Sequence, residues 1–89
     1  MFYESSINIV ESPDSTSTIK ELKGDLQPFR QTVSFEDGFY IDVTHRLFCN
    51  NEKEMTLDCY VQINEELFKI VFIEKWSDYL EVWLYHCKT

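Results

Sequence analysis

The fold of this chain is decided by residues 56–84, which read TLDCYVQINEELFKIVFIEKWSDYLEVWL. Apolar and polar side chains alternate over residues 59–63, so the apolar ones share one face of an extended strand. The polar run Asn-Glu-Glu that follows is short, which predicts a hairpin between this strand and a second one over residues 67–73. After another polar break, a last strand is predicted over residues 79–87.

The same alternation extends towards the N-terminus. Residues 39–49 alternate clearly and end at a polar turn, and residues 6–10 and 19–27 show shorter versions of the pattern. Gly24 lies inside the segment 19–27, where a glycine predicts a bulge or a sharp bend. Pro28 predicts the end of that strand, because proline cannot donate a hydrogen bond to a ladder.

Residues 29–38 have no clear period, and we predict a flexible loop there, or one short helical turn that begins at Ser34 and ends at Gly38. Six predicted strands and no long amphipathic helix indicate an all-β fold. We therefore expect a small single-domain β-barrel of about six mainly antiparallel strands over residues 1–89, with a sandwich as the alternative architecture.

The chain is acidic, with 16 acidic and 8 basic residues and a formal net charge of −8. This charge argues against a protein that coats nucleic acid, because phosphate neutralisation needs clustered Lys and Arg. It agrees with binding to a basic partner, with DNA mimicry, or with the lining of a passage to which DNA must not stick. Solubility alone would explain the charge equally well.

The N-terminal residues lack the basic and apolar regions of a signal peptide. No apolar run reaches the roughly 18 residues that a transmembrane helix needs, so no membrane association is expected. In a protein made in the cytoplasm, the three cysteines are predicted to be reduced thiols that fill apolar positions.

No arrangement of residues typical of a catalytic or metal site is found. On one strand, His45 and Cys49 would stand roughly 13 Å apart, and His86 and Cys87 would point to opposite faces. The paired spacing of a structural zinc site is absent, and the carboxylates are scattered over turns and outward positions. We therefore predict that the chain is not an enzyme and has no cofactor, metal or catalytic residue.

Aromatic side chains are frequent in the predicted strands. A nucleic-acid-binding barrel would stack bases on such rings over a basic groove, but the basic residues here do not cluster. We predict that most of the rings pack in the core, with one or two at a subunit interface. The aromatic residues of this set are Phe48, Tyr60, Phe72, Trp76, Tyr79, Trp83 and Tyr85.

The candidate interaction sites are one predicted strand and two segments between the predicted strands. The segment 67–73 is apolar on both faces apart from Lys69, so it is either a central strand or meets a neighbouring subunit. Residues 11–18 are rich in residues that interrupt strands and helices, and residues 30–39 lack a clear alternation of apolar and polar side chains. We predict interface roles for both segments, with Arg30 and Phe35 as the anchor residues. The full set of predicted interface residues is Pro13, Asp14, Arg30, Gln31, Phe35, Glu36 and Asp37.

Residues 23–88 resemble the small head-closure proteins of long-tailed bacteriophages, which are also called head–tail connector, head-completion or tail-stopper proteins. The matching pattern begins with GDLQP from Gly24, and continues with GFYIDV from Gly38 and RLFCN from Arg46. The hairpin with YVQI and LFKIV and the final WSDYLEVWL complete it. The resemblance rests on the order and spacing of the whole set.

This resemblance implies a viral structural protein: a β-barrel subunit that is monomeric in free solution and forms a homo-oligomeric ring on the virion. The ring would lie below the portal and adaptor proteins, close the DNA-filled head, and join it to a tail-completion protein. Genomic DNA would pass through it without sequence-specific binding. The protein would be made in the bacterial host cytoplasm and would end in the connector region of the virion.

The resemblance also implies a mobile loop that orders on assembly, and this loop maps to residues 29–39. The loop and the C-terminus are both short here, which leaves open whether the chain plugs the channel or only joins head to tail. The alternative function is a small acidic inhibitor or immunity-type binding protein. Such a DNA mimic would carry its acidic residues in phosphate-like rows on one convex face.

Overall fold

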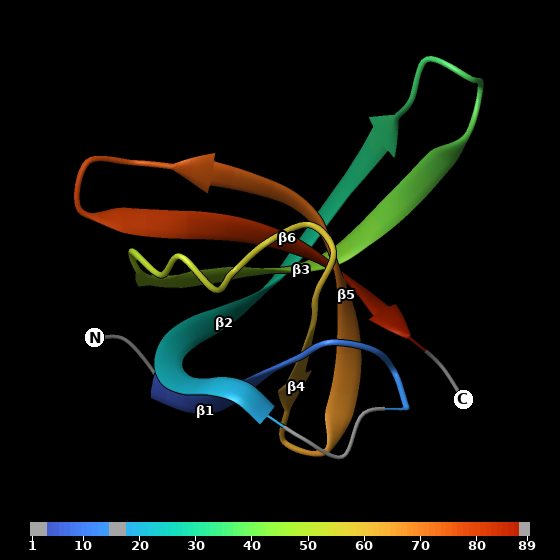
Figure 1. Ribbon diagram of the computed structural model, residues 1–89. Coiled ribbons are helices and arrows are strands. Elements are labelled where there is room, and N and C mark those ends of the chain that lie inside the picture. Colours follow the sequence, from blue (N-terminus) through green and yellow to red (C-terminus); the bar gives the residue numbers. More distant parts are fainter. Residues whose placement is uncertain (1–3, 15–17, 88–89) are drawn as a thin grey trace.

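The computed structural model describes residues 4–14 and 18–87, and these residues form a single all-β sheet closed into a barrel (Figure 1). All neighbouring strands are antiparallel, and the order around the barrel is β1-β2-β3-β6-β5-β4. The predicted six-stranded antiparallel β-barrel is therefore confirmed. The strands are β1 (Glu4–Val10), β2 (Thr18–Ser34), β3 (Tyr40–Asn50), β4 (Tyr60–Ile63), β5 (Glu66–Lys75) and β6 (Tyr79–Cys87).

The barrel closes through pairing between β1 and β4, in which Ile7 stands opposite Ile63. β3 pairs with β6 rather than with β4, so the connection from β3 to β4 crosses one end of the barrel. The predicted hairpin of β4 and β5 is present, and Asn64 and Glu65 form its turn with φ values of 52° and 68°. Two consecutive positive φ angles are the signature of a type I′ turn, which matches the twist of the flanking strands.

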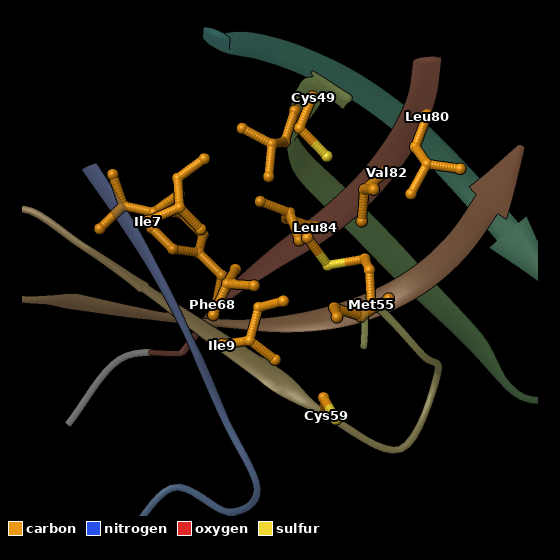
Figure 2. Close-up of a cluster of buried hydrophobic side chains, with 13 residues drawn as sticks. Ile7, Ile9, Cys49, Met55, Cys59, Phe68, Leu80, Val82 and Leu84 are labelled. Atoms are coloured by element: carbon orange, nitrogen blue, oxygen red, sulfur yellow. The ribbon is translucent and has the colours of Figure 1, made fainter. Parts of the chain in front are cut away.

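The core consists of aliphatic side chains from alternate positions of the strands, with Phe68 as its largest buried side chain (Figure 2). Met55 comes from the connection between β3 and β4 and packs against this cluster. Cys49 and Cys59 are buried in it as small apolar groups, as predicted, whereas Cys87 is half-buried. No described polar or charged residue is buried in the core.

The prediction that Pro28 ends its strand is wrong, because β2 continues through Pro28 to Ser34. The register of β2 against β3 shifts between Pro28 and Gln31, where the regular ladder is interrupted. A proline at such an irregularity removes no regular ladder hydrogen bond, so the strand tolerates it. The predicted loop or helical turn over residues 29–38 is likewise absent, and a strand and a tight turn take its place.

Gly24 does not mark a bulge, because it pairs regularly with Ser5 on β1 and with Cys49 on β3. Its role is to permit a close approach. A Cβ atom at this position would lie 2.7 Å from the carbonyl oxygen of Phe48 and 2.8 Å from Cδ1 of Ile7. The missing side chain therefore lets the wall of the barrel pack tightly where these three strands meet.

Candidate interaction site

Five of the seven predicted interface residues lie together on one projection, which we call the β2–β3 arm (residues 30–43). Arg30 and Gln31 belong to β2, and the other three form the turn before β3; all five are exposed: Arg30, Gln31, Phe35, Glu36 and Asp37. Pro13 and Asp14 are also exposed, but they precede β2 and lie at its opposite end. Residues 15–17 of the predicted loop 11–18 lie outside the described residues.

The β2–β3 arm extends away from the barrel as a two-stranded ribbon (Figure 1). Its pairing runs from Gln31 opposite Val43 to Ser34 opposite Tyr40. Within the described part of the chain, no other strand pairs with the two outer edges of this ribbon. The arm therefore presents two free backbone edges, which are the groups that recruit a further strand from a partner.

The turn of the arm is ordered by hydrogen bonds within it. The amide of Phe35 donates to the carbonyl of Phe39 at 2.8 Å, and the amide of Gly38 donates to the carbonyl of Phe35 at 3.1 Å. The amide of Phe39 also donates to Oδ1 of Asp37 at 3.3 Å. Gly38 has a φ of +90°, which a residue with a side chain rarely adopts.

The tip of the arm combines aromatic and acidic side chains. Phe39 is 70% exposed and Tyr40 67%, and Phe35 is 42% exposed. Glu36 and Asp37 lie between them in sequence. The sequence analysis included Phe39 at the end of the candidate segment 30–39, but it named neither Phe39 nor Tyr40 as an individual contact residue. The sequence feature that could have identified them is the pair of adjacent aromatic residues directly after a turn glycine.

A second surface follows the outward side of the barrel wall over β2, β3, β6 and β5, and we call it the outer face. It consists of Phe29, Arg46, Phe48, Phe72, Trp76, Tyr79, Glu81 and Trp83. Trp83 is central, with ring centroids 5.1 Å from Phe29 and 5.0 Å from Phe72. The Arg46 guanidinium lies 4.8 Å from the Phe29 ring centroid and 5.2 Å from that of Phe48. Such contacts stabilise the cation over the rings.

The prediction that most of the seven aromatic residues pack in the core is wrong. None of the seven is buried, and each stands on an outward or rim position. In β6, for example, Leu80, Val82 and Leu84 point inward, so Trp83 between them must point outward. The narrow interior is filled by aliphatic side chains and Phe68, and the rings instead contact one another outside the barrel.

A chain of polar contacts crosses the outer face from β2 to β6. Nε2 of Gln27 donates to Asp25 at 2.8 Å, and Nε of Arg46 donates to Oε1 of Gln27 at 3.2 Å. Nη1 of Arg46 lies 4.0 Å from Oε2 of Glu81. The same carboxylate accepts hydrogen bonds from the indole N–H groups of Trp76 and Trp83. The network fixes the orientation of the central side chains of this surface.

At one end of the outer face lies a hollow of about 500 Å³, which is open to solvent. The rings of Phe48 and Tyr79 line it, with centroids 6.0 Å apart, and Lys23 and Asp25 contribute from β2. Gly24 and Cys49, which face each other across β2 and β3, complete the lining together with Asn50. The hollow thus offers aromatic surface beside one exposed ammonium group.

Two titratable groups of the described residues have clearly perturbed pKa values: Cys49, which lines the hollow, and His45. Burial, reinforced by Glu52, raises the pKa of the Cys49 thiol to about 11, so this thiol is a poor nucleophile at neutral pH. Burial and the neighbouring His86 lower the pKa of His45, and Glu66 opposes them. Among residues 4–14 and 18–87, no group of three or more His, Cys, Asp or Glu residues is placed to hold a metal ion.

Several of the acidic side chains occupy turns that lie apart from one another. Glu36 and Asp37 stand on the tip of the arm, Glu65 lies in the β4–β5 turn, and Asp78 lies in the β5–β6 turn. Figure 1 shows these turns at different extremities of the molecule. These four acidic side chains therefore do not lie in a single row.

Comparison with protein-family models and with curated proteins gives no match to this chain. Within the described residues, no helix is long and apolar enough to span a membrane.

Proposed function

We propose that this chain is a structural subunit that acts by docking onto neighbouring protein surfaces through the β2–β3 arm. The observation that carries the proposal is the arm itself: a hydrogen-bonded hairpin that leaves the barrel with free edges and an exposed aromatic tip. Exposed aromatic side chains on a rigid element are typical anchors of protein interfaces, because they bury a large area at a small entropic cost.

The sequence resemblance supports a specific version of this function. On that basis the chain is a head–tail connector subunit of a long-tailed bacteriophage, which docks below the portal and adaptor, closes the filled head and joins it to the tail-completion protein. Residues 29–39, which the resemblance assigns to the assembly loop, coincide almost fully with the arm. In this proposal the arm is the contact element, and it is already a hairpin before assembly.

The charge of the chain supports the same function. A ring through which the genome passes must not retain DNA, and a subunit with a net charge of −8 repels phosphates. In this proposal the protein catalyses no reaction and carries no cofactor. It is made in the host cytoplasm, and its working location is the connector region of the virion.

The experiment uses purified protein and DNA-filled, tailless heads from a phage that carries this gene in disrupted form. The expected result is binding to the heads in a fixed copy number, followed by restored tail attachment and infectivity. Failure to bind, together with one-to-one capture of a basic phage or host protein, would replace the proposal with the acidic-inhibitor function.

A further inference from the structure

We propose that the tip of the β2–β3 arm of one copy docks into the outer-face hollow of a second copy. Phe39 would pack against the rings of Phe48 and Tyr79, and Glu36 would pair with Lys23. This inference rests on the proposed function and names one partner of the arm, which is another copy of this chain.

The arm cannot reach the hollow of its own chain. Phe39 directly precedes β3 and Phe48 lies near the far end of this strand, nine residues further along the extended chain. At about 3.4 Å per residue, this separates them by roughly 30 Å. The arm also projects in a different direction from the β5–β6 turn, next to which Tyr79 of the hollow begins β6 (Figure 1). Any contact between tip and hollow must therefore join two molecules.

The two surfaces match in chemistry. The tip carries the most exposed large apolar side chain of the described residues, Phe39, and the hollow is walled by two aromatic rings. A third ring packed against these two would form edge-to-face or offset contacts. Lys23 makes no ion pair with any described residue, and Glu36 is likewise free of one. Their opposite charges would pair across the contact.

The geometry of the contact also determines which kind of oligomer the copies would form. Tip and hollow are different surfaces of the same chain, so the contact is heterologous and continues from copy to copy. Such contacts close into a ring when the rotation between copies allows it. One hairpin tip buries well below the roughly 1,200 Å² of a stable interface, so free copies associate weakly and a template is needed to complete the ring.

The test is an isotope-filtered NOE experiment on an equal mixture of ¹³C-labelled and unlabelled full-length protein at low-millimolar concentration. The expected result is intermolecular NOEs between the ring protons of Phe39 and those of Phe48 and Tyr79. Amide shifts of Gly24 and Asn50 should move with protein concentration together with those of the arm tip. Absence of these NOEs, or concentration-dependent shifts confined to other surfaces, would overturn the proposal.

Charge reversal supplies the matched variants. We expect Glu36→Lys or Lys23→Glu alone to raise the self-association Kd by about fivefold, and the double variant to restore it to within about twofold. Glu36 is preferred over Asp37, because Asp37 accepts a hydrogen bond within the turn. A double variant as weak as the singles would contradict the pairing.

The outcomes separate this inference from the proposed function. If heads bind the protein in fixed copy number while no tip-to-hollow contact is found, the inference is wrong and the connector function stands. If the self-contact is found while heads are not bound, the self-contact stands and the connector function is wrong.

Discussion

The indole N–H of Trp83 donates to Oε2 of Glu81 at 2.8 Å, two residues away on the same outward side of β6. The other oxygen of this carboxylate accepts the indole N–H of Trp76 at 3.3 Å, and Nη1 of Arg46 lies 4.0 Å from Oε2. Glu81 therefore joins the β5–β6 turn to β3 and, through the ring of Trp83, to Phe29 at the base of the arm. It is the shared acceptor that links the polar contacts of the outer face to Trp83.

Replacing Glu81 should therefore destabilise the barrel. We expect Glu81→Ala to lower the free energy of unfolding by about 1.5–3 kcal/mol, because two indole donors and one guanidinium lose their acceptor. Glu74 lies directly opposite on β5 and is exposed, so Glu74→Ala is the matched control. It should change stability by no more than about 0.5 kcal/mol. Equal effects in urea unfolding would contradict the assigned role of Glu81.

The β4–β5 turn contains a strained residue that can be relieved. Glu65 has a φ of 68° at the second central position of a type I′ turn, where glycine is preferred. We expect Glu65→Gly to raise the free energy of unfolding by about 0.5–1 kcal/mol, since it creates the Asn-Gly turn without strain. Glu66→Gly, in the strand, should lower it instead. A loss of stability in Glu65→Gly would show that the turn is not type I′.

Gly24 is predicted to be intolerant of even one added carbon. We expect Gly24→Ala to lower the free energy of unfolding by about 1–3 kcal/mol, because the new Cβ would meet the Phe48 carbonyl oxygen and the Ile7 side chain. At Gly38 a Cβ meets nothing within 4 Å, but the φ of +90° opposes it. Gly38→Ala should therefore disturb amide signals of the arm and leave those of the barrel unchanged. A barrel that tolerates Gly24→Ala without loss would contradict the close approach.

The sequence predicted the barrel because most of the buried strand positions follow a two-residue period. In β6, Leu80, Val82 and Leu84 alternate with outward residues, and β3 shows the same pattern. The end of β6 at Cys87 was predicted correctly for that reason. This alternation of apolar and polar residues arises where one face of a strand is buried. It is absent where neither face of the strand is buried.

The arm is the part that sequence reasoning could not predict. From Gln31 to Ser34, β2 packs against nothing except its partner strand, so no periodic apolar pattern marks it. Pro28 indicated a strand end, and only the three-dimensional register reveals the irregularity that accommodates it. The outer face was missed for another reason. Composition identifies aromatic residues but cannot show that a barrel this narrow leaves most of them outside.

Stability should fall in mild acid because of His45, whose ring lies 6.2 Å from that of His86 and 5.1 Å from that of Phe68. Burial first, and then His86, lower the pKa of His45 below its usual 6.5, against the opposing effect of Glu66. The native state therefore binds the proton less tightly than the unfolded state. The stability contributed by neutral His45 is complete above pH 6.5 and is lost as the pH falls below that value.

The measurement is urea unfolding of the wild-type chain and His45→Gln between about pH 7.5 and about pH 5.5. We expect a smaller loss of stability in His45→Gln than in the wild type over this range. His86→Gln removes one cause of the shift, so it should raise the midpoint of the His45 ring titration seen by NMR. A wild-type His45 midpoint above 6.5 would contradict the prediction.

The arm should be separable from the barrel. Gln31 and Val43 stand directly opposite each other, so residues 32–42 can be replaced by Asn-Gly to close a two-residue hairpin. The excised residues contribute nothing to the buried core, so the free energy of unfolding should change by less than about 1 kcal/mol. A variant that unfolds or aggregates would show that the arm supports the barrel.

The most direct test of the central claim compares head binding by the wild-type chain, this arm-less variant and the Glu74→Ala surface control. We predict that the wild type and Glu74→Ala bind DNA-filled, tailless heads in the same fixed copy number, whereas the folded arm-less variant does not bind. Head binding by the arm-less variant with unchanged copy number would contradict the claim that the β2–β3 arm is the docking element.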